Sequence, residues 1–278
     1  MDWSRVKNIL IILFIALNIF LFVNIINISV SDNVSKKTLN NTVKILNSNN
    51  VALDCKIPTY SKDTGTPEFE ENVLSRGIIL GKLMGNIQLP SLDATQDGNL
   101  IESNGKWIVF NGNGFEYGNS NPDGNININS IDDIVKNIKL MLKDTQIPLG
   151  GFKPDYPEIK KLDEGKVMVT LREQKDGIII FDNRITVVAT EKGIISMALD
   201  YRKLVDITQP RKIIPAYQIL IRNFHRKSGT TITSIDFGFK ETPLDNEPAR
   251  FVDVPVWRIM NQEGQAEFYR ADNGEQIE

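Results

Sequence analysis

The sequence predicts an α+β protein, with a single N-terminal transmembrane helix followed by extracytoplasmic modules that each combine a helix with an antiparallel meander. Two observations lead to this prediction. Residues 9–28 form one apolar run without a charged side chain. In the second half of the chain, a helical apolar pattern followed by Val- and Ile-rich runs occurs twice.

The apolar run 9–28 is long enough to cross a bilayer, because a helix rises about 1.5 Å per residue and the hydrocarbon core is roughly 30 Å thick. It is also longer than the apolar region of a cleaved signal peptide, so we expect it to remain as an anchor. Arg5 and Lys7 precede it. The positive-inside rule then places residues 1–8 in the cytoplasm and the rest of the chain outside, as a single-pass protein of the cell membrane.

Asn18 lies near the middle of this apolar run. A membrane-embedded amide gains roughly 1 kcal/mol from a hydrogen bond to a neighbouring helix. We therefore predict that Leu17, Asn18 and Leu21 form a partner-binding face in the membrane. The alternative is that one Asn is tolerated in a long apolar helix.

The first elements outside the membrane are short. The polar segment 29–62 favours a juxtamembrane helix or an ordered linker, and a strand is expected at residues 51–57. The helix is indicated by apolar residues at near-helical spacing: Val34, Leu39, Val43 and Leu46.

A second helix is predicted from Thr66 and Pro67 to Met84, because Thr caps helices and Pro suits the first helical position. Residues 86–128 favour short strands and turns, and 106–110 is the clearest strand.

Residues 129–278 carry the repeated pattern. Ser130, with Asp133 three residues later, predicts a capped helix, and the apolar positions at 213–224 predict another. Strands are expected at 166–172, 177–190 and 193–206 after the first helix, and at 230–241, 250–261 and 264–277 after the second.

The predicted domains are therefore a cytoplasmic tail (1–8), a transmembrane anchor (9–28), an N-terminal extracytoplasmic domain with its linker (29–128) and a C-terminal extracytoplasmic domain with two helix-then-meander units (129–278).

The composition excludes several classes of function. The net charge is −3, and the chain has one cysteine, Cys55, and one histidine, His225. Nucleic-acid binders usually carry a basic face, and structural zinc sites take four Cys or His ligands, so neither class is expected. No phosphate-binding loop or hydrolase motif occurs in the sequence. We predict that the protein is not an enzyme and has no catalytic site, cofactor or metal site.

Three features have an ordinary structural explanation beside a functional one. His225 is expected near a helix end, and Cys55 as a small buried hydrophobic residue rather than a redox group. Residues 119–126 partly imitate a calcium loop, but Ser130 stands where the bidentate Glu belongs, and Asn-Pro-Asp-Gly is a common turn sequence.

The opening MDWSRVK (residues 1–7), followed by an apolar segment containing LNIFL (residues 17–21), resembles the start of YycI proteins. The resemblance implies a non-enzymatic membrane regulator in a Gram-positive bacterium. Its partners would be a YycH-like protein and the WalK-type sensor histidine kinase of the WalK/WalR (YycG/YycF) two-component system, which controls cell-wall homeostasis.

Residues 255–259 and 271–275 also resemble the end of a PepSY-type module. That leaves open an alternative, a binding or inhibitor module acting on a protease or cell-wall ligand.

Overall fold

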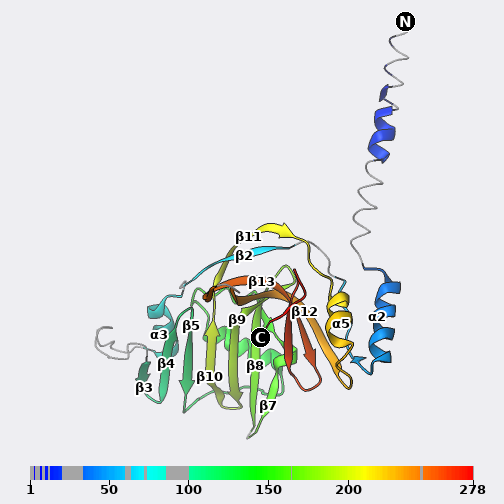
Figure 1. The fold of residues 1–278 in the computed structure, drawn as a ribbon. Helices are drawn as coiled ribbons and strands as arrows, with labels where there is room; N and C mark the ends of the chain where they lie inside the picture. Colours follow the sequence, from blue (N-terminus) through cyan, green and yellow to red (C-terminus); the bar gives the residue numbers. More distant parts are fainter. Residues whose placement is uncertain are drawn as a thin grey trace.

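A computed structural model describes residues 3, 7, 10–11, 13–20, 34–59, 64–71, 74–85, 100–163, 165–244 and 247–277. It shows the predicted α+β fold (Figure 1). The helices are α2 (Lys36–Ser48), α3 (Arg76–Met84), α4 (Ile131–Met141) and α5 (Ala216–Phe224), with a 3₁₀ turn η1 (Tyr156–Glu158). Residues 13–20 are helical as well.

The strands of the first half are β1 (Ala52–Leu53), β2 (Thr64–Glu70), β3 (Leu100–Ser103), β4 (Lys106–Asn111), β5 (Gly114–Asn119), β6 (Phe152–Pro154) and β7 (Lys160–Leu162). Those of the second half are β8 (Lys166–Lys175), β9 (Ile178–Thr190), β10 (Gly193–Asp200), β11 (Lys203–Arg211), β12 (Thr231–Leu244), β13 (Glu247–Asn261), β14 (Ala266–Arg270) and β15 (Gln276–Ile277).

Most strands join one large, mainly antiparallel sheet, whose order is β15-β14-β13-β12-β9-β10-β5-β4-β3. Strand β9 is the shared member. Near its start, Ile179 and Ile180 pair in parallel with Gly238 and Phe239 of β12, whereas residues 184–190 pair with β10. The two halves of the sheet therefore meet along one short parallel pairing.

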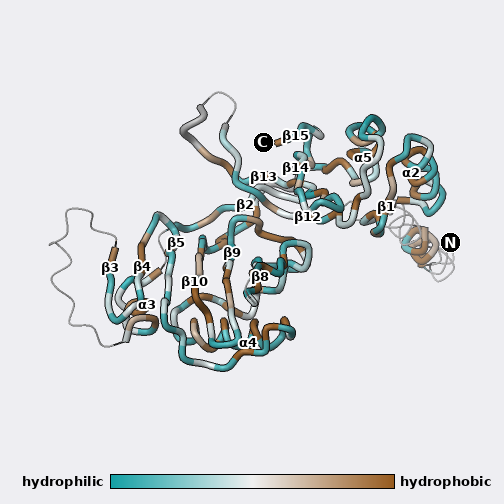
Figure 2. Tube along the Cα trace, turned by 90° about the horizontal axis from the view of Figure 1, so that it is seen from below, coloured by the Kyte–Doolittle hydropathy of each residue, from teal (hydrophilic) through white to brown (hydrophobic). Residues whose placement is uncertain are grey.

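Each half of the sheet has its own hydrophobic core. The first core packs α3 and α4 against β4, β5, β8, β9 and β10. The second packs α2 and α5 against β12, β13 and β14, and Figures 1 and 2 both show α2 beside α5. Figure 2 also shows hydrophobic residues gathered along β8 and β10. The first core contains residues on both sides of residue 128, and the predicted domain division there stays a prediction.

Local sequence explains where α4 begins. The hydroxyl of Ser130 accepts a hydrogen bond from the backbone N–H of Asp133 at 3.3 Å, which confirms the predicted N-cap. The carboxylate of Asp133 accepts from the backbone N–H of Asn127 at 2.8 Å. Ile134 and Ile138, one turn apart, are fully buried, so α4 lies with this face on the sheet.

The predicted helix from Thr66 to Met84 is wrong in its first part. Residues 64–70 form strand β2, and the helix begins only at Arg76. Strand β2 pairs antiparallel with β11, from Lys203 opposite Glu70 to Arg211 opposite Thr64. A distant strand partner thus overrides the local helix-start signal.

The predicted strand 193–206 is also wrong at its end. Strand β10 stops at Asp200, and β11 leaves the large sheet to pair with β2. The side chain of Asn183 fixes the turn between them, because it accepts from the Arg202 N–H at 2.9 Å and donates to the Arg202 carbonyl at 2.6 Å.

A buried ionic cluster connects the two halves of the sheet. We call it the Asp155 cluster; it consists of Asp155, Glu158, Arg172, Asp236 and Arg258. Arg258 of β13 is 1% exposed and donates to both carboxylate oxygens of Asp155, at 2.5 and 2.8 Å, and to Asp236 at 2.8 Å. Arg172 of β8 donates to Asp155 at 2.7 Å and to Glu158 at 2.6 Å. One carboxylate therefore holds an arginine from each half.

In the part of the chain that the structure describes, no helix has both the length and the apolar character needed to cross a bilayer. Residues 9, 12 and 21–28 of the predicted anchor lie outside the described residues.

Candidate protein-interaction surface

The first candidate surface is the predicted membrane face of Leu17, Asn18 and Leu21. Leu17 and Asn18 lie in the helical residues 13–20 and are exposed, whereas Leu21 lies outside the described residues. The amide nitrogen of Asn18 donates to the carbonyl oxygen of Phe14 at 2.9 Å, within its own helix. This bond uses one of the two amide hydrogens and leaves the other for a neighbouring helix. The partner-binding role of the face stays a prediction.

A second candidate surface is the two-stranded ribbon formed by β2 and β11, which Figure 1 shows crossing over the large sheet. Arg202, the residue directly before β11, fixes the ribbon to the fold. Its guanidinium donates to both oxygens of Asp253 in β13 at 2.8 Å and to Glu241 in β12 at 3.1 Å. It also lies over the ring of Phe69 in β2, 4.5 Å from the ring centroid.

The guanidinium of Arg202 stays charged over the whole physiological pH range, whereas burial raises the pKa of both Asp253 and Glu241. Burial disfavours the charged guanidinium, but the hydrogen bonds and charge of Asp253, followed by the charge of Glu241, outweigh it and raise the pKa of Arg202. Two guanidinium nitrogens of Arg202 thus attach the ribbon to Asp253 of β13 through charge-assisted hydrogen bonds.

The outer part of the ribbon is exposed and apolar. Val205 and Ile207 of β11 are 59% and 39% exposed. Among the described strands, β11 pairs only with β2, so its other edge has no strand partner. Its pairing with β2 shifts register after Leu204 and again after Thr208, which limits indiscriminate pairing at an edge. Val205 stands at the first shift and Ile207 between the two shifts, and the Ile207 N–H donates to the side chain of Asp206 at 2.8 Å.

Sequence reasoning missed this ribbon because it assigned residues 66–70 to a helix and 203–206 to the preceding strand. It anticipated exposed sheet edges only as a class of surface. The sequence did hold one signal for a separate strand. The apolar residues Leu204, Val205 and Ile207 follow shortly after Tyr201 and Arg202, where the preceding strand ends.

The single histidine and the single cysteine occupy structural positions. The Nδ1 atom of His225 lies 2.8 Å from the carbonyl oxygen of Ile221, at the end of α5. Burial, followed by the charges of Asp236 and Asp54, raises the pKa of Cys55 to about 11, which keeps the thiol protonated. Among the residues with a described position, no group of three or more His, Cys, Asp or Glu side chains is placed to hold a metal ion.

Comparison with known proteins gives the family. One solved structure, an uncharacterized protein from Eubacterium rectale, is similar at 12% sequence identity with a TM-score of 0.48, over 84% of this chain and 98% of that chain. No curated protein matches. Residues 29–272 match the family model described as YycI protein. This match covers most of the chain, so the chain belongs, as predicted, to the YycI family, whose role is that of a regulatory accessory protein in the WalK system.

Proposed function

We propose that this protein is a non-enzymatic, membrane-anchored regulator that modulates a WalK-type sensor histidine kinase, together with a YycH-like protein. The observation that carries the proposal is the family match over residues 29–272. The uncharged run 9–28, preceded by Arg5 and Lys7, supports a single-pass protein with its N-terminus in the cytoplasm. In this proposal residues 29–128 and 129–278 lie outside the membrane.

Such a regulator acts by binding and not by chemistry. It shifts the kinase between conformations only by the difference between its affinities for them. A rigid surface serves this purpose because it accepts one arrangement of the partner and rejects another. The β2–β11 ribbon supports the idea, because Arg202 fixes it to β12 and β13 while Val205 and Ile207 remain exposed.

The ribbon fits a recognition mode based on strand addition. In this mode a partner segment pairs with an open strand edge through main-chain hydrogen bonds, and neighbouring side chains select the sequence. We propose that a partner's extracytoplasmic domain adds to the open edge of β11, while Leu17, Asn18 and Leu21 contact a partner helix in the membrane.

Crosslinking in living cells tests both contacts. A photoreactive amino acid is placed at position 205, at position 18 or, as a control, at position 162. Leu162 is a matched control because it is an apolar residue of an edge strand, β7, and is 41% exposed. We expect the kinase or the YycH-like protein to be captured from positions 205 and 18 but not from position 162.

Transcription controlled by the kinase provides the second readout. Val205→Glu with Ile207→Glu, and separately Asn18→Leu, should change the output, whereas Leu162→Glu should not. All of these side chains are exposed, so the folded protein should persist at normal levels. Efficient incorporation at position 205 without capture of either partner, combined with unchanged output of the double variant, would refute the ribbon contact.

A further inference from the structure

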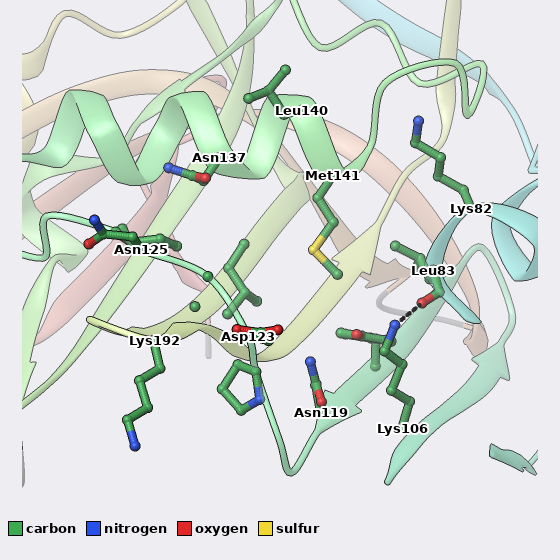
Figure 3. A pocket seen from close by; sticks show the side chains of 16 residues that line it. Lys82, Leu83, Lys106, Asn119, Asp123, Asn125, Asn137, Leu140, Met141 and Lys192 are labelled. Atoms are coloured by element: carbon green, nitrogen blue, oxygen red, sulfur yellow. Dashed lines mark hydrogen bonds between the residues drawn. The ribbon is translucent and has the colours of Figure 1, made fainter. Parts of the chain in front are cut away.

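A cavity of ≈ 400 Å³ opens between α3, α4, β5 and the β9–β10 turn (Figure 3). None of its lining residues belongs to β2 or β11, so it is separate from the ribbon. Its charged lining consists of three lysines, Lys82, Lys106 and Lys192, and one carboxylate, Asp123, so the lining has a net charge of +2. The whole chain, in contrast, has a net charge of −3.

The positive charges are only weakly compensated. Lys106 of β4 donates to the backbone carbonyl of Leu83 at 3.2 Å. Lys82 has one distant ion pair, at 4.0 Å, with an exposed carboxylate. Among the described residues, neither Lys106 nor Lys192 forms an ion pair with a carboxylate. Figure 3 shows Lys106 near Asn119, while Lys82 and Lys192 lie on opposite sides of the cavity rim with their side chains extending outward.

The cavity wall is held in place by backbone contacts. The backbone N–H of Ile126, which is buried, donates to the carbonyl of Glu191 at 2.9 Å and fastens the 119–126 loop to the β9–β10 turn. Gly193 in that turn has φ +137°, and a Cβ there would lie 3.0 Å from the ring of Pro122. The close approach of loop and turn therefore requires glycine.

Polar groups suited to hydroxyls also line the cavity. The amide nitrogen of Asn137 in α4 donates to the Asp133 carbonyl at 2.9 Å, which leaves its amide oxygen as an acceptor. Asp123 contributes a carboxylate. Met141 of α4 points toward the centre in Figure 3 and supplies apolar contact.

We propose that this cavity binds a phosphorylated polyol, a small molecule with one phosphate monoester and several hydroxyl groups. A phosphate monoester carries a charge of about −1.5 to −2 at neutral pH, which matches the net charge of the lining better than a single carboxylate does. Lysine ammonium groups bind phosphate as point charges. The hydroxyls donate to Asp123 and Asn137, and the carbon chain lies against Met141. The volume is within the range of small-molecule sites.

Isothermal titration calorimetry on the full chain in detergent micelles tests the proposal. Three probes share one carbon skeleton and differ in charge: sorbitol 6-phosphate, gluconate and sorbitol. We expect sorbitol 6-phosphate to bind, gluconate to bind at least about tenfold more weakly and sorbitol not to bind, because the phosphate supplies the larger charge. Equal binding of gluconate would overturn the assignment to phosphate, and no binding of sorbitol 6-phosphate at millimolar concentration would overturn the site.

Variants separate binding from stability. Lys106→Gln should weaken binding of sorbitol 6-phosphate by about tenfold, because a charge-assisted contact is replaced by a neutral one. Lys192→Gln, on the exposed turn, should weaken it without lowering the melting temperature. Lys160→Gln, on exposed β7, is the control and should leave binding unchanged. The proposal is wrong if Lys106→Gln and Lys192→Gln both bind sorbitol 6-phosphate as tightly as the parent protein. If Lys106→Gln then also lowers the melting temperature, Lys106 serves only to cap the end of α3.

Discussion

Replacing Arg258 by Met should destabilise the protein far more than the same change at a surface arginine. Arg258 is 1% exposed and binds Asp155 through two nitrogens. Met keeps an unbranched apolar stem but is shorter and has no charge, so Asp155 retains only Arg172 as an ionic partner, and Asp236 loses its ion pair with Arg258. Removing one partner of a buried ion pair typically costs about 3–5 kcal/mol. Because Arg172 remains, we expect Arg258→Met to lower the free energy of unfolding by about 3 kcal/mol, the lower end of this range.

Arg184→Met is the matched control. Arg184 is also a strand arginine paired with an aspartate, Asp200, at 3.1 Å, but the two side chains are 52% and 41% exposed. Exposed pairs contribute roughly 0–1 kcal/mol. Urea denaturation of the full chain in detergent, followed by tryptophan fluorescence, measures both variants, and the slope with urea should stay unchanged. A loss below about 1 kcal/mol for Arg258→Met would refute the reasoning on burial.

The cost of Arg258→Met should depend on pH. Burial opposes ionisation of Asp155, but the hydrogen bonds and charges of Arg258 and Arg172 outweigh it and lower its pKa from the usual 3.8. A lowered carboxyl pKa stabilises the native state above the unfolded pKa, and this contribution is lost as the pH falls through the native value. The difference in the free energy of unfolding between the parent protein and Arg258→Met should therefore be largest at pH 7 and should shrink below about pH 4.

Three further predictions concern single positions. Ser130→Ala should lower the free energy of unfolding by about 1 kcal/mol, measured by urea denaturation, because the cap to Asp133 is lost. Gly238→Ala should cost about 3 kcal/mol in the same assay, because its Cβ would lie 2.2 Å from the Ile179 carbonyl oxygen. At pH 7, Cys55 should react with iodoacetamide about a hundredfold more slowly in the native protein than in urea. The thiolate is the nucleophile, and the pKa of Cys55 rises from 9.0 to about 11 in the native protein. Equal reaction rates would contradict this prediction.

Helices α2 and α4 were predictable because their signals are local. The spacing of Leu39, Val43 and Leu46 favoured a helix or an ordered linker where α2 lies, and Ser130 marked the start of α4. Both signals lie within a few residues of the element they define.

The ribbon and the Asp155 cluster were not predictable, because their determinants lie far apart in the chain. Residues 64–70 become a strand only because β11 pairs with them. Asp155 and Arg258 each look like an ordinary surface charge in the sequence, and only the join between the two halves of the sheet brings them together. The predicted membrane face of Leu17, Asn18 and Leu21 depends on partners and stays a prediction.

The pairing of the first elements with the last has a consequence for the order of folding. Helix α2 packs against α5, β1 pairs with β12 and β2 pairs with β11. During synthesis these N-terminal segments emerge first, yet each waits for a partner made much later, and closing such long loops is slow. The first core, whose members are nearer in sequence, can form earlier. The N-terminal segments therefore pass through a period in which they are exposed to chaperones and proteases, and a truncated chain would leave them without a place to bind.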